Sequence, residues 1–205
     1  MVVSKGFSIQ PLAPGAIIEY GVTLRNRSPN LDAVRLTVSV NAVDNRGRSV
    51  ATDEQDISVV PAGSAFNVAG QLTPNVTLAA PRLNATIKVG QMKRSHIRLP
   101  VVSGVRLHGS DGQYDRSVSG RVTNPYKKPL SDLAVIHAVF LDARGRIVGS
   151  AHDLTGAKVR PGATVAFVLF PANDPVKPVS VRISVDPCDS LDWGTSDCPI
   201  PTGNP

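Results

Sequence analysis

An internal repeat constrains the fold of this chain more than any other sequence feature. With Asn26 placed over Asn124, about thirty residues of the two halves align without a gap. The pentapeptide DNRGR at Asp44–Arg48 then lies over DARGR at Asp142–Arg146. The offset of 98 residues, from position 26 to position 124, is too long for a solenoid repeat and fits a small all-β domain. The sequence therefore predicts two copies of one domain.

Each copy alternates apolar and polar residues with a period of two, which is typical of strands that bury one face. In the first copy, the apolar residues Tyr20, Val22 and Leu24 alternate with Gly21, Thr23 and Arg25. Turn clusters separate such runs: NRSPN, DNRGR and PAGS in the first half, and NPYKKP, DARGR and RPGA in the second. We therefore expect an all-β chain of two tandem immunoglobulin-like β-sandwiches related by internal duplication.

The expected domain boundaries follow from this repeat. We place one immunoglobulin-like sandwich at residues 1–95, a second at residues 96–187, and a Pro-rich, disulfide-closed tail at residues 188–205. The boundary between the sandwiches lies in the polar, basic stretch Met92–Pro100. The total length of 205 residues suits two domains of about 100 residues each.

Four short motifs over Val118–Gly162 carry a family resemblance. They are V-x-G-x-V-x-N, L-x-D-L-x-V, F-L-D-A-R-G-R-I-V-G-S and V-R-P-G, and this order resembles that of bacterial FxLYD-type domains. Tyr20–Gly63 matches less fully, and Leu141 stands where that family has Tyr. The TNPY at Thr123–Tyr126 is similar to the entry of water-stress (late-embryogenesis-abundant type 2) domains. Both resemblances imply an immunoglobulin-like sandwich with a non-enzymatic role, and FxLYD-type domains usually sit outside the cytoplasmic membrane behind an anchor.

The two cysteines, Cys188 and Cys198, are separated by nine residues. This spacing is too wide for a CxxC redox or zinc motif, so a disulfide that closes a short loop is the simplest interpretation. Such a bond would stabilise the fold by roughly 2.5 kcal/mol and persists in oxidising compartments. Two reduced thiols are the alternative. MVVSKGFSIQ lacks the features of a signal peptide, so either the protein is cytosolic or its leader or anchor lies outside the printed sequence. The expected disulfide favours the second, and we expect an extracytoplasmic chain from the bacterial cell envelope or secreted.

The formal net charge of +6, with 15 Arg and 7 Lys, favours contact with anionic material such as a wall polymer or a lipid surface. No recognition helix or aromatic-rich motif accompanies the basic residues, so nucleic acid is not an expected partner. No apolar run approaches the ~20 residues of a transmembrane segment. A solvated, mildly basic surface is the simplest explanation of the charge.

No motif in the sequence indicates catalysis. The four histidines, His96, His108, His137 and His152, form neither H-x-H nor H-E-x-x-H spacing. A G-x-S-x-G elbow and a phosphate-binding loop are also missing from the sequence. The aspartates around the cysteine loop (Asp186, Asp189, Asp192 and Asp197) lack the calcium-loop pattern. We therefore assign no catalytic, cofactor-binding or metal-binding residue and expect a protein that is not an enzyme.

The two copies differ along one strand. Its outward positions are Arg35, Thr37, Ser39 and Asn41 in the first copy, and Leu133, Val135, His137 and Val139 in the second. An apolar outward stripe is either covered by the same chain, for example by the Pro-rich tail, or used for contact. As an interaction face, it would bind the first domain, a second copy or a partner protein.

These observations predict a non-catalytic interaction or structural module that mediates protein–protein contact or self-assembly. The alternative is a module that binds carbohydrate or a cell-wall polymer. Such a module needs exposed aromatic side chains beside polar groups, and Tyr114, Tyr126 and Trp193 are the candidates in this sequence.

Overall fold

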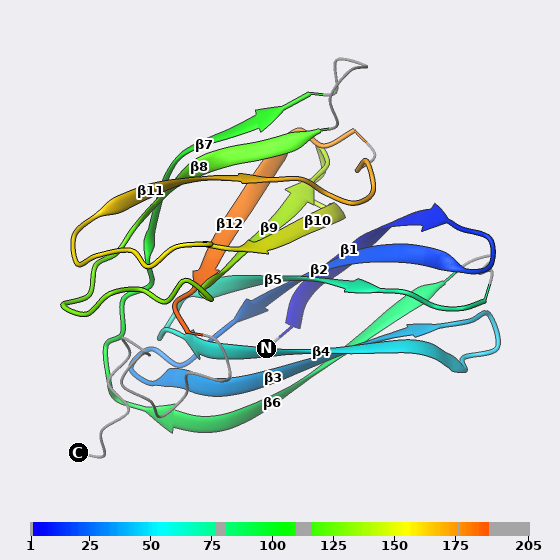
Figure 1. Cartoon of the computed structure of the whole chain (residues 1–205). Coiled ribbons are helices and arrows are strands. Elements are labelled where there is room, and N and C mark those ends of the chain that lie inside the picture. Colours follow the sequence, from blue (N-terminus) through cyan, green and yellow to red (C-terminus); the bar gives the residue numbers. More distant parts are fainter. Residues whose placement is uncertain (1, 77–80, 110–115, 176, 189–205) are drawn as a thin grey trace.

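The computed structural model describes residues 2–76, 81–109, 116–175 and 177–188, and all regular structure in these ranges is β (Figure 1). The expected all-β class is therefore confirmed. The strands are β1 (Val2–Pro11), β2 (Ala16–Arg25), β3 (Asp32–Val43), β4 (Ser49–Val60), β5 (Ala65–Leu72), β6 (Arg82–Lys93), β7 (Val101–His108), β8 (Ser117–Thr123), β9 (Val135–Leu141), β10 (Ile147–Leu154), β11 (Thr164–Leu169) and β12 (Ser180–Asp186).

The strands form four antiparallel sheets of three strands each. The first half of the chain, residues 1–95, contains the sheets β1-β2-β5 and β4-β3-β6, and the second half, residues 96–187, contains β11-β8-β7 and β10-β9-β12. Each sheet of one half has a counterpart with the same strand order in the other half. β6 ends at Lys93 and β7 begins at Val101, so the extended segment between them joins the halves.

Each half is sandwich-like, with its own apolar core between its two sheets. In the first half, the inward residues of β2, such as Tyr20 and Val22, pack against those of β3, such as Leu36 and Val38. In the second half, Ile136 and Phe140 of β9 are likewise fully buried. The period of two in the sequence therefore reports the inward faces correctly.

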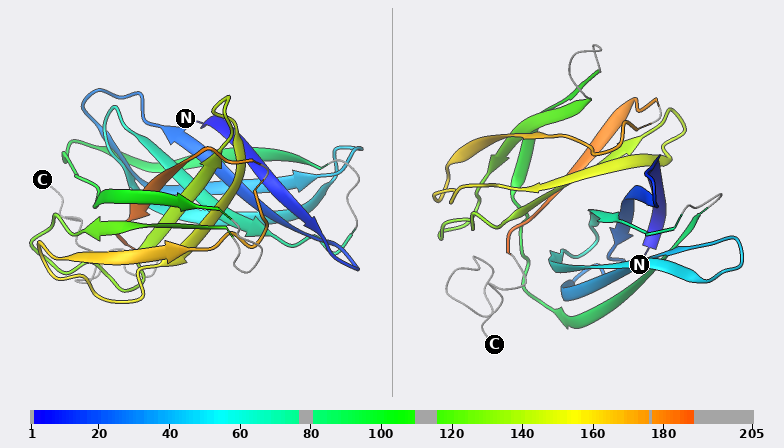
Figure 2. Two further views of the ribbon diagram at one scale, coloured as in Figure 1. Left: turned by 90° about the horizontal axis from the view of Figure 1, so that it is seen from above. Right: turned by 45° about the vertical axis from the view of Figure 1, so that its right-hand side comes forward.

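The two halves pack against each other through one sheet of each. β1, β2 and β5 of the first half lie on β9, β10 and β12 of the second half, as the views of Figures 1 and 2 agree in showing. The sheets that meet are not counterparts, because the counterpart of β1-β2-β5 is β7-β8-β11. The contact is therefore heterologous, and it leaves the outer faces of β4-β3-β6 and β7-β8-β11 outside it.

The repeated pentapeptides form two hairpin turns with the same hydrogen bonds. Asp44 Oδ1 accepts from the backbone amides of Arg46 and Arg48 at 2.9 Å. Asp142 Oδ1 accepts from the matching amides of the second copy, also at 2.9 Å. Gly47 and Gly145 supply the positive φ that the turns require, at 78° and 73°. The side chains of Arg48 and Arg146 fold back onto the aspartates, and they remain largely exposed to solvent.

A membrane-crossing helix needs a long apolar run, and within the described ranges of the chain no helix has the length and hydropathy for it.

Candidate functional site: the contact between the two halves

Glycines bring the two halves of the chain unusually close together. A Cβ atom on Gly6 of β1 would lie 2.1 Å from the carbonyl oxygen of Ile147 on β10. On Gly21 of β2, a Cβ would lie 2.7 Å from Cγ1 of Val139 on β9. Any larger residue at either position would force the sheets apart, so the contact depends on these two glycines.

Buried polar groups fasten one end of this contact. The carboxylate of Glu19, which is 5% exposed, accepts from the backbone amides of Ala172 and Asn173 at 2.6 and 2.9 Å. Asn173 returns a hydrogen bond from its Nδ2 to the carbonyl oxygen of Ile17 at 3.0 Å. Burial raises the pKa of Glu19, and the two amide donors oppose that rise.

A histidine lies at the centre of the contact. His137 is 1% exposed, and its Nδ1 accepts from the backbone amide of Ala69 at 3.1 Å. Its ring meets that of Phe66 edge-on, with centroids 5.8 Å apart. Burial lowers the pKa of His137 to about 3, and His152, its neighbour across the β9–β10 pair, adds to the lowering. The imidazole is therefore neutral at physiological pH, with Nδ1 also 3.3 Å from the carbonyl oxygen of Ala69.

Two contacts that involve serine side chains join the halves at the other end of the interface. The carboxylate of Asp186 accepts from both the backbone amide and the hydroxyl of Ser58, which is 128 positions away in the chain. The amide of Asn67 donates to Oγ of Ser184 at 2.9 Å. These residues are all buried, so breaking the contact would leave several polar groups exposed to water or without a hydrogen-bond partner. The two halves are therefore joined by a specific interface rather than by the linker alone.

The stripe singled out in the sequence divides between this interface and its margin. His137 and Val139 lie against the first half, through Ala69 and Gly21. Leu133 and Val135 are half-buried near the start of β9. The Pro-rich tail, suggested above as a cover for the stripe, lies outside the described residues from position 189 onward.

The other residues named from the sequence are scattered. His96 and His108 are exposed on different segments, and within the described ranges no three His, Cys, Asp or Glu side chains gather into a metal site. Asp186 belongs to the interface, whereas Asp189, Asp192 and Asp197 lie outside the described residues. Cys188 is buried and Cys198 lies outside them, so their pairing stays a prediction.

Among the aromatic candidates for a carbohydrate site, Tyr126 lies within the described residues, whereas Tyr114 and Trp193 do not. The Tyr126 side chain is half-buried, and its hydroxyl donates to the carbonyl oxygen of Arg98 at 2.6 Å. Burial raises the pKa of this phenol, with the charge of Asp186 as a second cause. Tyr126 is thus held as a structural residue, not presented to solvent as a stacking platform.

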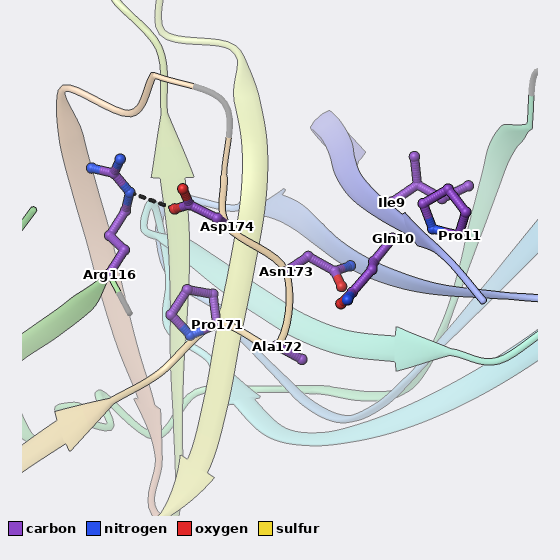
Figure 3. Close-up of a pocket in the computed structure, with 8 residues that line it drawn as sticks. All are labelled: Ile9, Gln10, Pro11, Arg116, Pro171, Ala172, Asn173 and Asp174. Carbon is purple, nitrogen blue, oxygen red and sulfur yellow. Dashed lines mark hydrogen bonds and ion pairs between the residues drawn. The ribbon is translucent and has the colours of Figure 1, made fainter. Parts of the chain in front are cut away.

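A cavity of about 420 Å³ opens beside the Glu19 end of the interface (Figure 3). It is lined by Ile9, Gln10, Pro11, Arg116, Pro171, Ala172, Asn173 and Asp174. Arg116 Nε donates to Asp174 Oδ1 at 2.8 Å, so the one cation and the one carboxylate of the cavity lining already pair with each other. The lining has no histidine, cysteine or serine and no aromatic ring. It therefore offers neither a nucleophile with its base nor a surface on which a sugar ring could stack.

Sequence reasoning did not find Glu19, Ser58 or Ser184 as interface residues. Their sequence signal is weak, because a polar residue at an outward strand position is normally solvated. Gly6 and Gly21 have a clearer sequence signal for an interface, since a glycine inside a strand often marks a close backbone approach. β1 itself, with Lys5, Phe7 and Ile9 in alternation, was also not expected as a strand.

Comparisons with known proteins do not identify a family. No family model matches the chain, and no curated protein matches it. Among solved structures, it is similar to red sea bream transglutaminase, with 15% identity, 92% of this chain covered and a TM-score of 0.27. This chain spans 30% of that transglutaminase.

Two further structures share even less with the chain. Vicilin from Corylus avellana (hazelnut) is 10% identical over 85% of this chain and 72% of its own, with a TM-score of 0.19. A mutant of Bacillus subtilis oxalate decarboxylase is 10% identical over 92% and 78%, with a TM-score of 0.12. Scores this low carry no argument about activity.

Proposed function

We propose that the chain is a pair of immunoglobulin-like sandwiches that arose by duplication, and that it works as a non-catalytic, extracytoplasmic module for protein–protein contact. The identical strand order of the halves and their matching Asp-centred turns support the duplication. The buried Glu19, His137 and Asp186 support a non-catalytic role, because each is engaged in holding the halves together.

The observation that carries the contact function is a difference between counterpart faces. The outer face of β1-β2-β5 is covered, and Thr23 and Asn67 on it are 4% and 6% exposed. Among the described residues, the outer face of β7-β8-β11 has no such cover: Val101 is 54% and Val168 50% exposed, and Phe170, just beyond β11, is 62% exposed. Val168 and Phe170 lie at one end of this sheet and Val101 at the other. An uncovered sheet face that exposes apolar side chains is a surface that another protein could cover.

Capture of partners from the native envelope tests this proposal. The wild-type chain and a Val168→Glu variant would be used as bait, and each would also be measured by analytical ultracentrifugation for self-association. Thr86→Glu, on the exposed face of β6, is the matched control because it adds the same charge at an exposed strand position. We expect Val168→Glu to lose a protein, or a second copy, that wild type and control retain. Identical behaviour of all three proteins in both measurements would refute the contact function of this face.

A second candidate function, binding of an anionic cell-wall polymer, is supported by a separate group of basic residues in the second half. Lys127, Lys128, Lys158 and Arg160 are all exposed on two neighbouring connections. Binding of the intact chain to isolated cell-wall material, with and without added salt, tests it.

A further inference from the structure

Two connections at one end of the second half bring four cations together. The β8–β9 connection, residues 124–134, carries Lys127 and Lys128, and the β10–β11 connection, residues 155–163, carries Lys158 and Arg160. All four side chains are exposed. Figure 1 shows the two connections close together, at the left-hand end of the second half.

A buried asparagine holds the two connections in place. Nδ2 of Asn124, which is 0% exposed, donates to the carbonyl oxygens of Lys128 and Val159, both at 2.8 Å. Leu130 and Val159 exchange backbone hydrogen bonds at 2.9 and 3.1 Å. The hydroxyl of Tyr126 donates to the backbone carbonyl oxygen of Arg98 at 2.6 Å, which ties the first connection to the segment between β6 and β7. The cations are therefore mounted on a preorganised frame, which lowers the entropy cost of binding a ligand.

No ion pair among the described residues balances the charges of this group. The two connections contain one carboxylate, that of Asp132. The ion pairs among the described residues join Arg48 to Asp44, Arg116 to Asp174 and Arg146 to Asp142, and none of them includes these cations. Like charges on one small surface repel each other and raise the local concentration of anions.

The first half shows that the frame does not require the charges. Nδ2 of Asn26 makes the same pair of bonds, to the carbonyl oxygens of Leu31 and Val60 at 2.7 and 3.0 Å. The positions that match the four cations are uncharged there. They are Pro29 and Asn30 on one connection, and Val59 and Pro61 on the other. The basic group is therefore an addition specific to the second half.

We propose that Lys127, Lys128, Lys158 and Arg160 bind a linear polymer with repeated phosphate charges that is not a nucleic acid. Lysine ammonium groups bind phosphate as point charges, and several of them along two connections match a ligand whose charge repeats. The large apolar residues of these connections do not suit a lipid or a nucleobase: Leu130 and Val159 are buried, and Leu133 and Tyr126 half-buried. The proposal rests on the second candidate function and names its ligand class and residues.

Binding of long-chain inorganic polyphosphate to the intact chain tests the proposal. We expect the wild-type chain to bind it with an affinity that falls steeply with added salt, and the Lys127→Glu/Lys158→Glu variant to bind about tenfold or more weakly. Arg46→Glu/Arg144→Glu is the matched control, since it changes the net charge equally at two exposed hairpin tips. The control should stay within about twofold of wild type, because its charges lie on other connections.

The same measurement separates the competing outcomes. No binding by wild type, or equal loss in both double variants, would overturn the proposal. Tighter binding to vesicles with anionic phosphatidylglycerol headgroups would assign the surface to a membrane, and tighter binding to an oligo(dT) strand would assign it to nucleic acid; either would overturn the polymer proposal. Partner capture through Val168 is independent, so its failure would leave polyphosphate binding unchanged.

Discussion

The ring of His137 and the backbone of Ala69 meet across the interface between the two halves, with the Ala69 amide donating to Nδ1 at 3.1 Å. Nδ1 also lies 3.3 Å from the carbonyl oxygen of Ala69, so the backbone of this one residue meets the ring with both a donor and an acceptor. Nε2 is buried and has no hydrogen-bond partner among the described residues. A second proton on this ring would place a charge inside the buried interface.

We predict that acid weakens the fold through His137. Its pKa is 6.5 in the unfolded chain and about 3 in the folded one. The stabilisation is therefore complete above pH 6.5 and is lost as the pH falls from 6.5 towards 3, by about 1.4 kcal/mol per pH unit. Urea unfolding of wild type and of His137→Gln across this range measures the effect. The difference between their free energies of unfolding should change with pH.

His96→Gln, at an exposed position, is the control for this pH series and should follow the wild-type curve. Parallel curves for wild type and His137→Gln would show that His137 does not supply the pH dependence.

Gly6→Ala tests the close approach of the two sheets. The added Cβ would meet the backbone carbonyl of Ile147, which cannot rotate away, so β1 must move off β10. We expect a loss of about 2–3 kcal/mol in the free energy of unfolding, the range of a strongly overpacked site. Gly109→Ala is the control, because nothing lies within 4 Å of its added Cβ. Equal stability of the two variants would contradict the described packing.

Asn26→Ala and Asn124→Ala should destabilise the chain to a similar extent. Each substitution leaves two carbonyl groups without their donor, which costs about 2–4 kcal/mol in total. Denaturant unfolding measures both, with Asn30→Ala at an exposed loop position as the control. A loss of stability in only one of the two asparagine variants would contradict the equivalence of the two frames.

Acid should also loosen the two hairpin turns. Hydrogen bonds from the Arg48 and Arg146 amides hold the pKa values of Asp44 and Asp142 below their usual 3.8. Their contribution is therefore present above pH 3.8 and is lost as the pH falls through the lowered pKa. The protection of the Arg48 and Arg146 amides from hydrogen exchange, relative to the intrinsic rate at each pH, would fall first in this range. In Asp44→Asn and Asp142→Asn variants the change should disappear, and its persistence would refute the assignment.

Strand positions and turns were predictable because both are local. The period of two located the inward residues of β2 and β3, and the Asp and Gly of the pentapeptides specified the turns. Register was less accessible. The apolar pattern of Asn84–Val89 resembles that of Val179–Val185 and would place Val89 opposite Val185. Pairing with β3 and β9 gives that place to Ile87 instead. A slip of two residues keeps every side chain on its face, so the sequence pattern does not detect it.

The interface was only partly predictable for a similar reason. His137 and Val139 stood out because they replace the polar Ser39 and Asn41 of the first copy. The opposing surface, with Glu19, Thr23 and Asn67, looks like an ordinary solvated face, and only the fold shows what covers it. Polar residues that pair across 100 or more positions leave no local sequence pattern.

The central claim is that the two halves form one rigid body through this interface. Nitrogen-15 NMR relaxation of the full chain tests it most directly, because it reports how fast each half tumbles. The described packing predicts one rotational correlation time shared by amides of β1–β6 and β7–β12, and a Gly6→Ala variant in which the two groups separate. Two different and shorter correlation times in the wild-type chain would contradict the claim.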